Sequence, residues 1–397
     1  MLLIIGFIFL LLTILGYYKG KDLFSPDVLV SGVWFMVILL YYLLPHNFYP
    51  IQNRFPLCII MWVVGYYVSA QVVAYVTPCG KNKHLIDRRI YVPETILACF
   101  ATVYLAYSAI KAASGSELFF LYLRSLSTGL DENISTGGST IWGYFRSAML
   151  IVYLIELTRT EHFSKKRTVI FLLLNLLVSF VTMAKSQLFT IVVTSLVVLY
   201  RKKRISRQHI LVVGLLFLVL CIIIQILRSN SDSFSISSFL ASYILSGSVA
   251  FDYFDPNDVA PSGSNVFRFF EALLYRLGIS DNPSNQTILQ YIQIGGSGYS
   301  VTNVYTMLYP FFTDYGYAGV AAFAIICGSI SGYFYKKSKS SDAALVFYSV
   351  IASTIIFGFM GELFFTNFST MLQYLIFTYM PFYIVVSSNS LKKYVSR

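Results

Sequence analysis

A small set of basic residues lies away from the segments in which most lysines and arginines of this chain cluster: Arg54, Lys111, Arg124, Arg146, Lys185, Arg228, Arg268 and Arg276. Arginine keeps its charge, and its planar guanidinium forms paired hydrogen bonds with phosphate oxygens. Arg268 and Arg276 are about two helical turns apart and so fall on nearly the same face of a helix. Lys185 lies between two apolar runs, and Arg228 ends another. Three or four such cations together could hold a diphosphate group. Alternatively, each caps a helix end or extends its charge to lipid headgroups.

Most acidic residues lie in the same kind of segment, and a carboxylate there could act as a general base toward a sugar hydroxyl. The densest group is Asp252, Asp255 and Asp258. The full set is Glu117, Asp131, Glu132, Asp232, Asp252, Asp255, Asp258, Glu271, Asp281, Asp314 and Glu362. Solvated loop acids, or partners for arginine, are the alternative interpretation. Tyrosines in these segments could stack on sugar rings or form an interfacial belt: Tyr243, Tyr253, Tyr275, Tyr291, Tyr299, Tyr305 and Tyr315.

The sequence predicts neither a metal site nor a disulfide framework. His46 is the one histidine in these segments, and no carboxylate–histidine pair has the spacing of metal ligands. The five cysteines form no CxxC pair, and most of them lie in apolar runs. No Walker motif, GxSxG, HExxH or GxGxxG in a βαβ context is present, which disfavours nucleotide-driven chemistry. We therefore expect no metal and no cofactor.

The elements that must position these groups are predicted to be transmembrane helices. The chain is 57% apolar and 12% charged, with a mean hydropathy of +0.69, whereas a soluble domain carries about a quarter charged residues. Apolar runs predict about eleven spans: 1–18, 28–44, 56–76, 93–113, 140–158, 168–184, 186–200, 210–227, 318–335, 342–362 and 367–388. We expect an all-α polytopic integral membrane protein, with one helical bundle over residues 1–397.

Charge then predicts how the chain is oriented. Clusters of lysine and arginine follow the first, third, fifth, seventh and ninth spans and also close the chain. By the positive-inside rule these clusters are cytoplasmic, so the N-terminus is outside and the C-terminus is inside. This arrangement accounts for the net charge of +11 without nucleic acid as a partner.

Two outer segments, residues 114–139 and 228–317, are too long for simple turns and are expected to be functional. The second contains an amphipathic stretch from Phe267 to Leu277. We predict that it forms part of a small helical cap on the outer surface, or partly enters the bilayer. No internal repeat is visible, which counts against inverted-repeat transporters.

The stretch from Thr302 through Asp314 and Gly316 to Gly319, which leads directly into a span, resembles the Wzy-type O-antigen (oligosaccharide repeat unit) polymerases. The layout is similar too: about eleven spans, a large outer loop before the last three, and a tight hairpin at Ala184-Lys185-Ser186. The resemblance implies a GT-C-like polymerase/ligase membrane fold in the inner membrane of a bacterium, with residues 114–139 and 228–317 as the first and second large periplasmic loops.

The resemblance implies metal-independent glycosyl transfer at the periplasmic face. The growing glycan on undecaprenyl diphosphate would be the donor, and a fresh lipid-linked repeat unit would be the acceptor. Arginines of the two periplasmic loops are linked to function in that family. The diphosphate-binding candidates are Arg228, Arg268, Arg276, Arg124 and Lys185, with Asn303 and Tyr305 as substrate contacts. The general base is left open among Asp314, Asp252 and Glu271. A chain-length regulator protein is a further expected partner.

Two other functions remain as alternatives. The related O-antigen ligases begin a similar motif with a His-Asn pair, whereas Thr302 precedes Asn303 here, which argues against a ligase. A flippase or transporter for the lipid-linked oligosaccharide would be expected to carry more charges within its spans. The sequence leaves open the sugar repeat, the linkage and its stereochemistry, the oligomeric state, and the choice between O-antigen and capsule or exopolysaccharide.

Overall fold

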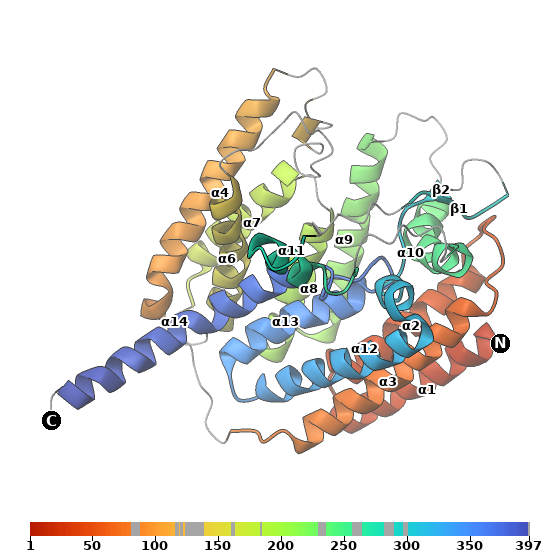
Figure 1. Cartoon of the computed structure of the whole chain (residues 1–397), viewed down its shortest axis with the longest axis horizontal. Coiled ribbons are helices and arrows are strands. Elements are labelled where there is room, and N and C mark those ends of the chain that lie inside the picture. The colour runs from red at the N-terminus through yellow and green to blue at the C-terminus, as the bar shows by residue number, and fades with distance from the viewer. Residues whose placement is uncertain are drawn as a thin grey trace. The chain divides into compact units, whose positions relative to one another are not determined.

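The computed structural model describes the chain except residues 81–87, 116–118, 120–121, 124–138, 160–162, 183–184, 229–235, 256–263, 282–289, 297–300 and 396–397. The described part is mostly helical (Figure 1). Its helices are α1 (Leu2–Gly20), α2 (Pro26–Leu43), α3 (Arg54–Val76), the 3-10 helix η1 (Arg88–Tyr91), α4 (Val92–Ala113), α6 (Ser139–Thr158), α7 (Lys165–Thr182), α8 (Lys185–Arg201), α9 (Arg207–Arg228), α10 (Ile236–Tyr253), α11 (Arg268–Arg276), α12 (Tyr309–Lys337), α13 (Asp342–Phe357) and α14 (Phe368–Val395). Two short strands, β1 (Ile292–Gln293) and β2 (Val301–Thr302), pair antiparallel.

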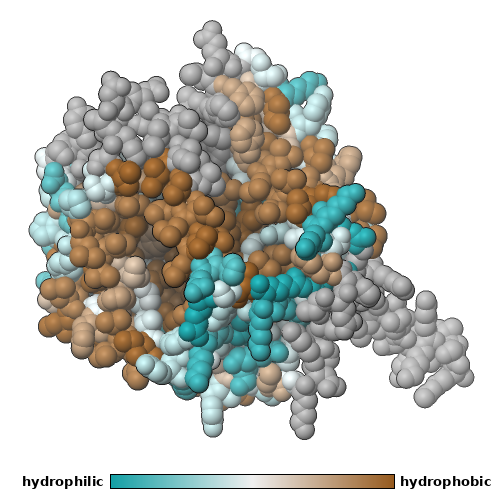
Figure 2. Space-filling view, turned by 180° about the vertical axis from the view of Figure 1, so that it is seen from behind, coloured by the Kyte–Doolittle hydropathy of each residue, from teal (hydrophilic) through white to brown (hydrophobic). Residues whose placement is uncertain are grey.

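Each of the apolar ranges expected to span the membrane contains a helix, and α10 and α11 lie in addition within residues 228–317. Among the described residues, five helices are long and apolar enough to cross a bilayer: α1, α2, α3, α4 and α12. Apolar side chains also cover broad areas of the face in Figure 2, as expected where lipid is the solvent. These observations are consistent with a polytopic membrane protein. The number of crossings, their orientation and the resemblance to the GT-C-like fold stay predictions.

The chain divides into two compact units. Unit 1 comprises Met1–Cys79, Ile222–Lys336 and Ile351–Ser369. Unit 2 comprises Gly80–Cys221, Lys337–Val350 and Thr370–Arg397. The single bundle expected over residues 1–397 stays a prediction.

Unit 1 is built around α1, α2, α3 and α12, which run alongside one another (Figure 1). α3 and α12 approach each other closely. A Cβ at Gly328 would collide with backbone at Tyr66, and one at Gly332 would collide with backbone at Ala70. These two glycines are four residues apart, which is the spacing at which small residues let two membrane helices pack backbone to backbone. They therefore set the distance between α3 and α12.

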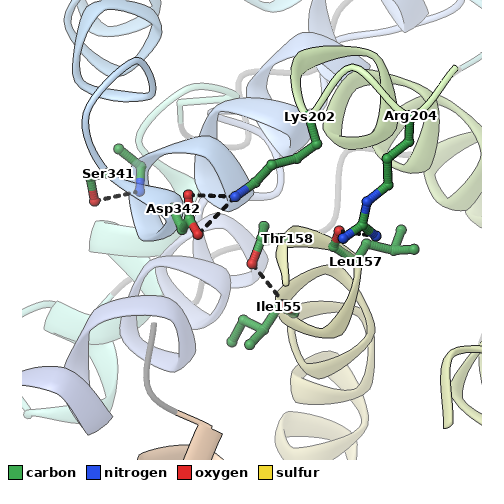
Figure 3. Close-up of polar contacts among 8 residues, drawn as sticks. Ile155, Leu157, Thr158, Lys202, Arg204, Ser341 and Asp342 are labelled. Carbon is green, nitrogen blue, oxygen red and sulfur yellow. Dashed lines mark hydrogen bonds and ion pairs between the residues drawn. The ribbon is translucent and has the colours of Figure 1, made fainter. Parts of the chain in front are cut away.

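Unit 2 contains α4, α6, α7 and α8, which pack on one another. At the end of α8, Lys202 donates to both carboxylate oxygens of Asp342 at 2.9 Å, and both side chains are almost fully buried (Figure 3). Next to this pair, Arg204 donates to the backbone carbonyl of Leu157 at 3.0 Å. A buried ion pair is tolerated when such hydrogen bonds compensate its desolvation. These contacts tie the α8–α9 turn to α6 and to the start of α13.

We predict that Gly332→Ala destabilises the protein by about 1–3 kcal/mol, because the new methyl group must push α3 and α12 apart. The matched control is Gly214→Ala in α9, where the Cβ would enter open space. Alanine is favoured over glycine in a helix by about 0.5–1 kcal/mol, so this variant should be at least as stable as the parent. Thermal unfolding of the purified protein in detergent measures both. A rise in the midpoint for both variants would contradict close packing at Gly332.

Candidate functional site

The stretch that resembles the polymerases forms the entry into α12. Tyr305 stacks on Tyr309 with ring centroids 4.4 Å apart, and its hydroxyl donates to the backbone carbonyl of Gln290 at 3.0 Å. Gly316 interrupts the helix with φ 60° and ψ −150°, a conformation essentially reserved for glycine. The kink brings the backbone of Phe311 so close to Gly319 that a Cβ there would collide with it. Both glycines of the stretch are therefore required by the shape of this entry.

Asp314 lies in this entry, and its carboxylate holds the turn that precedes α11. Its Oδ2 accepts hydrogen bonds from the Ser264 hydroxyl at 2.6 Å and the Val266 N–H at 3.0 Å. Its Oδ1 accepts from the side-chain amide of Asn265 at 2.8 Å and from the Asn265 N–H at 3.2 Å. A carboxylate beside the N–H groups at the start of a helix is favoured by the helix dipole. Asp314 thus fixes the start of α11 to the start of α12.

The stretch from Phe267 to Leu277 is confirmed as a helix, α11, and its two ends are defined locally. At the start, Ser264 Oγ accepts from the Phe267 N–H at 3.0 Å, while Glu271 Oε1 accepts from the Ser264 N–H at 2.9 Å. At the end, Gly278 adopts φ 70°. The N–H of Gly278 then binds the carbonyl of Tyr275, and the next N–H binds the carbonyl of Leu274. This is a Schellman motif, in which a left-handed glycine stops the helix.

Asp252 and Arg54 cap each other's helices. Asp252, near the end of α10, accepts hydrogen bonds from the N–H groups of Gln52 and Phe55 at the start of α3, the second at 2.8 Å. Arg54, at the start of α3, donates to the backbone carbonyl of Phe254 at 2.6 Å, just beyond α10. Its guanidinium also lies over the Phe254 ring, 4.7 Å from the centroid. The N-terminus of α3 and the C-terminus of α10 are therefore held together by hydrogen bonds of the Asp252 carboxylate and the Arg54 guanidinium with backbone groups.

The structure brings part of the candidate site together. Arg268, Glu271 and Arg276 share α11, and Asp314 anchors that helix. Asp252 lies instead at the α3–α10 contact. Asn303 and Tyr305 precede α12 in the chain, and burial together with neighbouring Tyr309 raises the pKa of the Tyr305 phenol to about 12. Tyr305 is therefore a neutral hydrogen-bond donor at physiological pH.

The remaining cations of the expected site lie outside what the structure describes. Arg124 is not described, and the same holds for the side chains of Lys185 and Arg228, which begin α8 and end α9 respectively. Two cations that were not assigned to the site have defined surroundings. Arg54 lies among carbonyls and aromatic rings, as above, and Arg146 lies within α6 beside Tyr374. Arg54 and Arg146 are among the basic residues that lie outside the clusters of lysine and arginine. That position in the sequence was the signal by which both could have been found. Among the described residues no group of histidine, cysteine and acidic side chains is arranged to hold a metal ion.

Similarity to a known protein extends along nearly the whole chain. A curated protein of Escherichia coli (strain K12), named "Putative O-antigen polymerase", is 22% identical over 390 residues. The alignment covers 92% of this chain and 94% of that protein. The similarity therefore runs through almost all of both chains. No family model matches the chain, and no solved structure matches it significantly.

We predict that Asp314→Asn loosens α11, because the amide nitrogen that replaces one oxygen cannot accept the hydrogen bond from the backbone N–H. Loss of a hydrogen bond to a charged group costs about 1.5–3 kcal/mol. The amides of residues 264–276 should then exchange with deuterium roughly ten- to a hundredfold faster. Asp281→Asn, an exposed acid beyond the other end of α11, is the matched control and should leave the exchange unchanged. Equal exchange in both variants would show that Asp314 does not hold α11.

Proposed function

We propose that this chain polymerises undecaprenyl-diphosphate-linked oligosaccharide repeat units by glycosyl transfer at the periplasmic face of the inner membrane of a bacterium. The observation that carries the proposal is the similarity to the E. coli protein over nearly the full length of both chains. The apolar helices support it, because both substrates of such a reaction are anchored in a bilayer. Helix α11 carries two arginines and a glutamate and is fixed to the entry of α12. The proposed chemistry needs such groups, namely cations for the diphosphate and a carboxylate for the proton.

In the proposed reaction a hydroxyl of the acceptor repeat unit attacks the anomeric carbon of the donor glycan. A new C–O bond forms, the bond between that carbon and the diphosphate breaks, and undecaprenyl diphosphate leaves with the electron pair. The acceptor proton passes to a general base. Because the diphosphate already activates the donor, the transfer needs no nucleotide. We assign the neutralisation of charge on the departing diphosphate to Arg268 and Arg276, with Arg124, Arg228 and Lys185 as further candidates.

Among the three candidate bases, the hydrogen bonds favour Glu271. Both carboxylate oxygens of Asp314 and both of Asp252 accept hydrogen bonds that hold a helix start. In the described part of the chain, Glu271 receives one such bond, on Oε1, which leaves Oε2 to accept a proton. Glu271 also lies on the same helix as the two arginines. Asn303 and Tyr305 are proposed to contact the sugars.

Arg268→Ala and Arg276→Ala should each abolish long glycan chains, because loss of one such donor lowers a transfer rate about 10²–10³-fold. A lysine at either position keeps the charge without the paired hydrogen bonds and should retain part of the activity. Arg207→Ala, in a predicted cytoplasmic cluster, is the control. Each variant is expressed in a strain that lacks the chromosomal gene. A polysaccharide gel of the lipopolysaccharide then shows the lengths of the glycan chains.

The phenotype also separates the alternatives. Loss of a polymerase leaves a single repeat on the acceptor lipid, whereas loss of a ligase leaves none. Loss of a flippase leaves single repeats on the cytoplasmic leaflet. Long chains from both arginine-to-alanine variants, at membrane levels equal to the parent, would refute the role of α11.

Glu271→Gln tests the base while preserving the fold, since the glutamine carbonyl can still accept the hydrogen bond from Ser264. We expect transfer in a purified system to fall about 10²–10⁴-fold. Hydrogen exchange of α11 should stay at the parental level. Asp252→Asn is the comparison, since Asp252 is assigned a capping role and its replacement should lower thermal stability. Full transfer activity in Glu271→Gln would exclude Glu271 as the base.

A further inference from the structure

Helix α11 has one apolar and one polar face. At 100° per residue, Phe269, Phe270, Leu273, Leu274 and Leu277 fall within one arc of the helix. Arg268, Glu271 and Tyr275 fall on the opposite arc, and Arg276 lies at the edge between the two. The expectation that Arg268 and Arg276 share nearly the same face is therefore wrong, because eight residues at 100° each place them about 80° apart. An amphipathic helix normally buries its apolar arc against the rest of the protein.

This helix does not bury its apolar arc. Phe269 and Phe270 contact the ring of Phe368, with centroids 5.4 and 5.2 Å away. Further along the same arc the side chains are exposed, with Leu273 at 44%, Leu274 at 40% and Leu277 at 63% of their surface. None of the nine residues of α11 is buried. The exposed side chains Leu273, Leu274 and Leu277 therefore need an apolar partner other than the described residues of this chain.

The contacts of α11 place it beside a candidate membrane span. Asp314 ties its start to α12 immediately before the kink at Gly316. Phe267 then contacts the ring of Phe323, with centroids 6.2 Å apart. Phe323 lies seven residues beyond Gly316, which is about two helical turns or 10 Å into the apolar part of α12. The start of α11 is thus level with the first two turns of α12 beyond the kink, and a helix at that depth meets the boundary between lipid headgroups and acyl chains.

We propose that α11 lies in the plane of the membrane surface, with Leu273, Leu274 and Leu277 inserted among lipid acyl chains. Arg276, at the edge of the apolar arc, then meets lipid phosphates, which are complementary to it in charge. The opposite arc, with Arg268 and Glu271, faces the aqueous side at headgroup height. This placement follows from the contacts of α11 alone and does not depend on the proposed transferase activity.

The test uses the full chain without its five cysteines, reconstituted in vesicles of phosphatidylethanolamine and phosphatidylglycerol. A nitroxide label is attached to a single cysteine at Leu274 or Leu277, and in matched variants at Ala272 or Tyr275 on the polar arc. Labels at 274 and 277 should collide more often with oxygen, which concentrates in acyl chains, than with a water-soluble nickel chelate. Labels at 272 and 275 should show the reverse.

Two reference positions calibrate the measurement. Ile325, 53% exposed within α12, represents the bilayer, and exposed Tyr291, which precedes β1, represents the region outside α12. Greater access of the nickel chelate to 274 and 277 would overturn the proposal. Immobile labels that neither reagent reaches would also overturn it, since protein would then cover the face.

If the cysteine-free chain does not fold, Leu277→Trp in the natural chain, quenched by nitroxide lipids, gives the same decision. The gel analysis of Arg268→Ala tests the proposed function independently. A labelling result that overturns the membrane placement of α11 therefore leaves the proposed function standing.

Discussion

The placement of helices in unit 1 depends on carboxylates that accept hydrogen bonds from backbone N–H groups at or just before helix starts. The first N–H groups of a helix have no acceptor within it, and in a membrane protein little water is available to supply one. Asp252 of α10 supplies the acceptor for α3, and Asp314 of α12 supplies it for the turn before α11. Glu362 accepts hydrogen bonds from the N–H groups of residues 364–366 in the turn before α14, at 2.7–3.0 Å. Because the first two carboxylates come from a different helix than the one they cap, each bond also fixes how two helices are placed.

The hydrogen bonds to backbone N–H groups also distinguish acids that hold the fold from acids that could take part in the proposed reaction. A carboxylate whose two oxygens both accept hydrogen bonds from backbone N–H groups is already engaged in holding the fold. Asp252 and Asp314 are of this kind. Glu271 contributes one oxygen to the turn at Ser264. The same reasoning applies to the cations, since Arg54 caps α10 through the carbonyl of Phe254, whereas Arg268 and Arg276 lie on the accessible helix α11.

Hydropathy predicted where most helices lie, because the length of an apolar run is a local property of the sequence. The same reasoning missed α10, whose serines, among them Ser246 and Ser248, lower its hydropathy although the structure buries both. It found α11 from its periodicity alone. It could not predict which acids cap which helices, because Asp252 meets Phe55 across 197 positions of sequence, and no spacing rule connects such a pair. Arg54 was visible as a charge outside the basic clusters, but its partners were not.

The stretch from Thr302 to Gly319 shows why a sequence motif and a chemical site need not coincide. Its most constrained positions, Gly316 and Gly319, are explained by a positive φ and a close backbone contact at the entry of α12. Its acid, Asp314, is explained by the turn it holds. In this chain these positions start α12 and fasten a short helix beside it. The groups to which we assign the proposed chemistry lie on α11, where Arg268, Glu271 and Arg276 fall outside the stretch. Arg268 and Arg276 can therefore be replaced without removing the contacts of Gly316, Gly319 and Asp314 that shape the entry of α12.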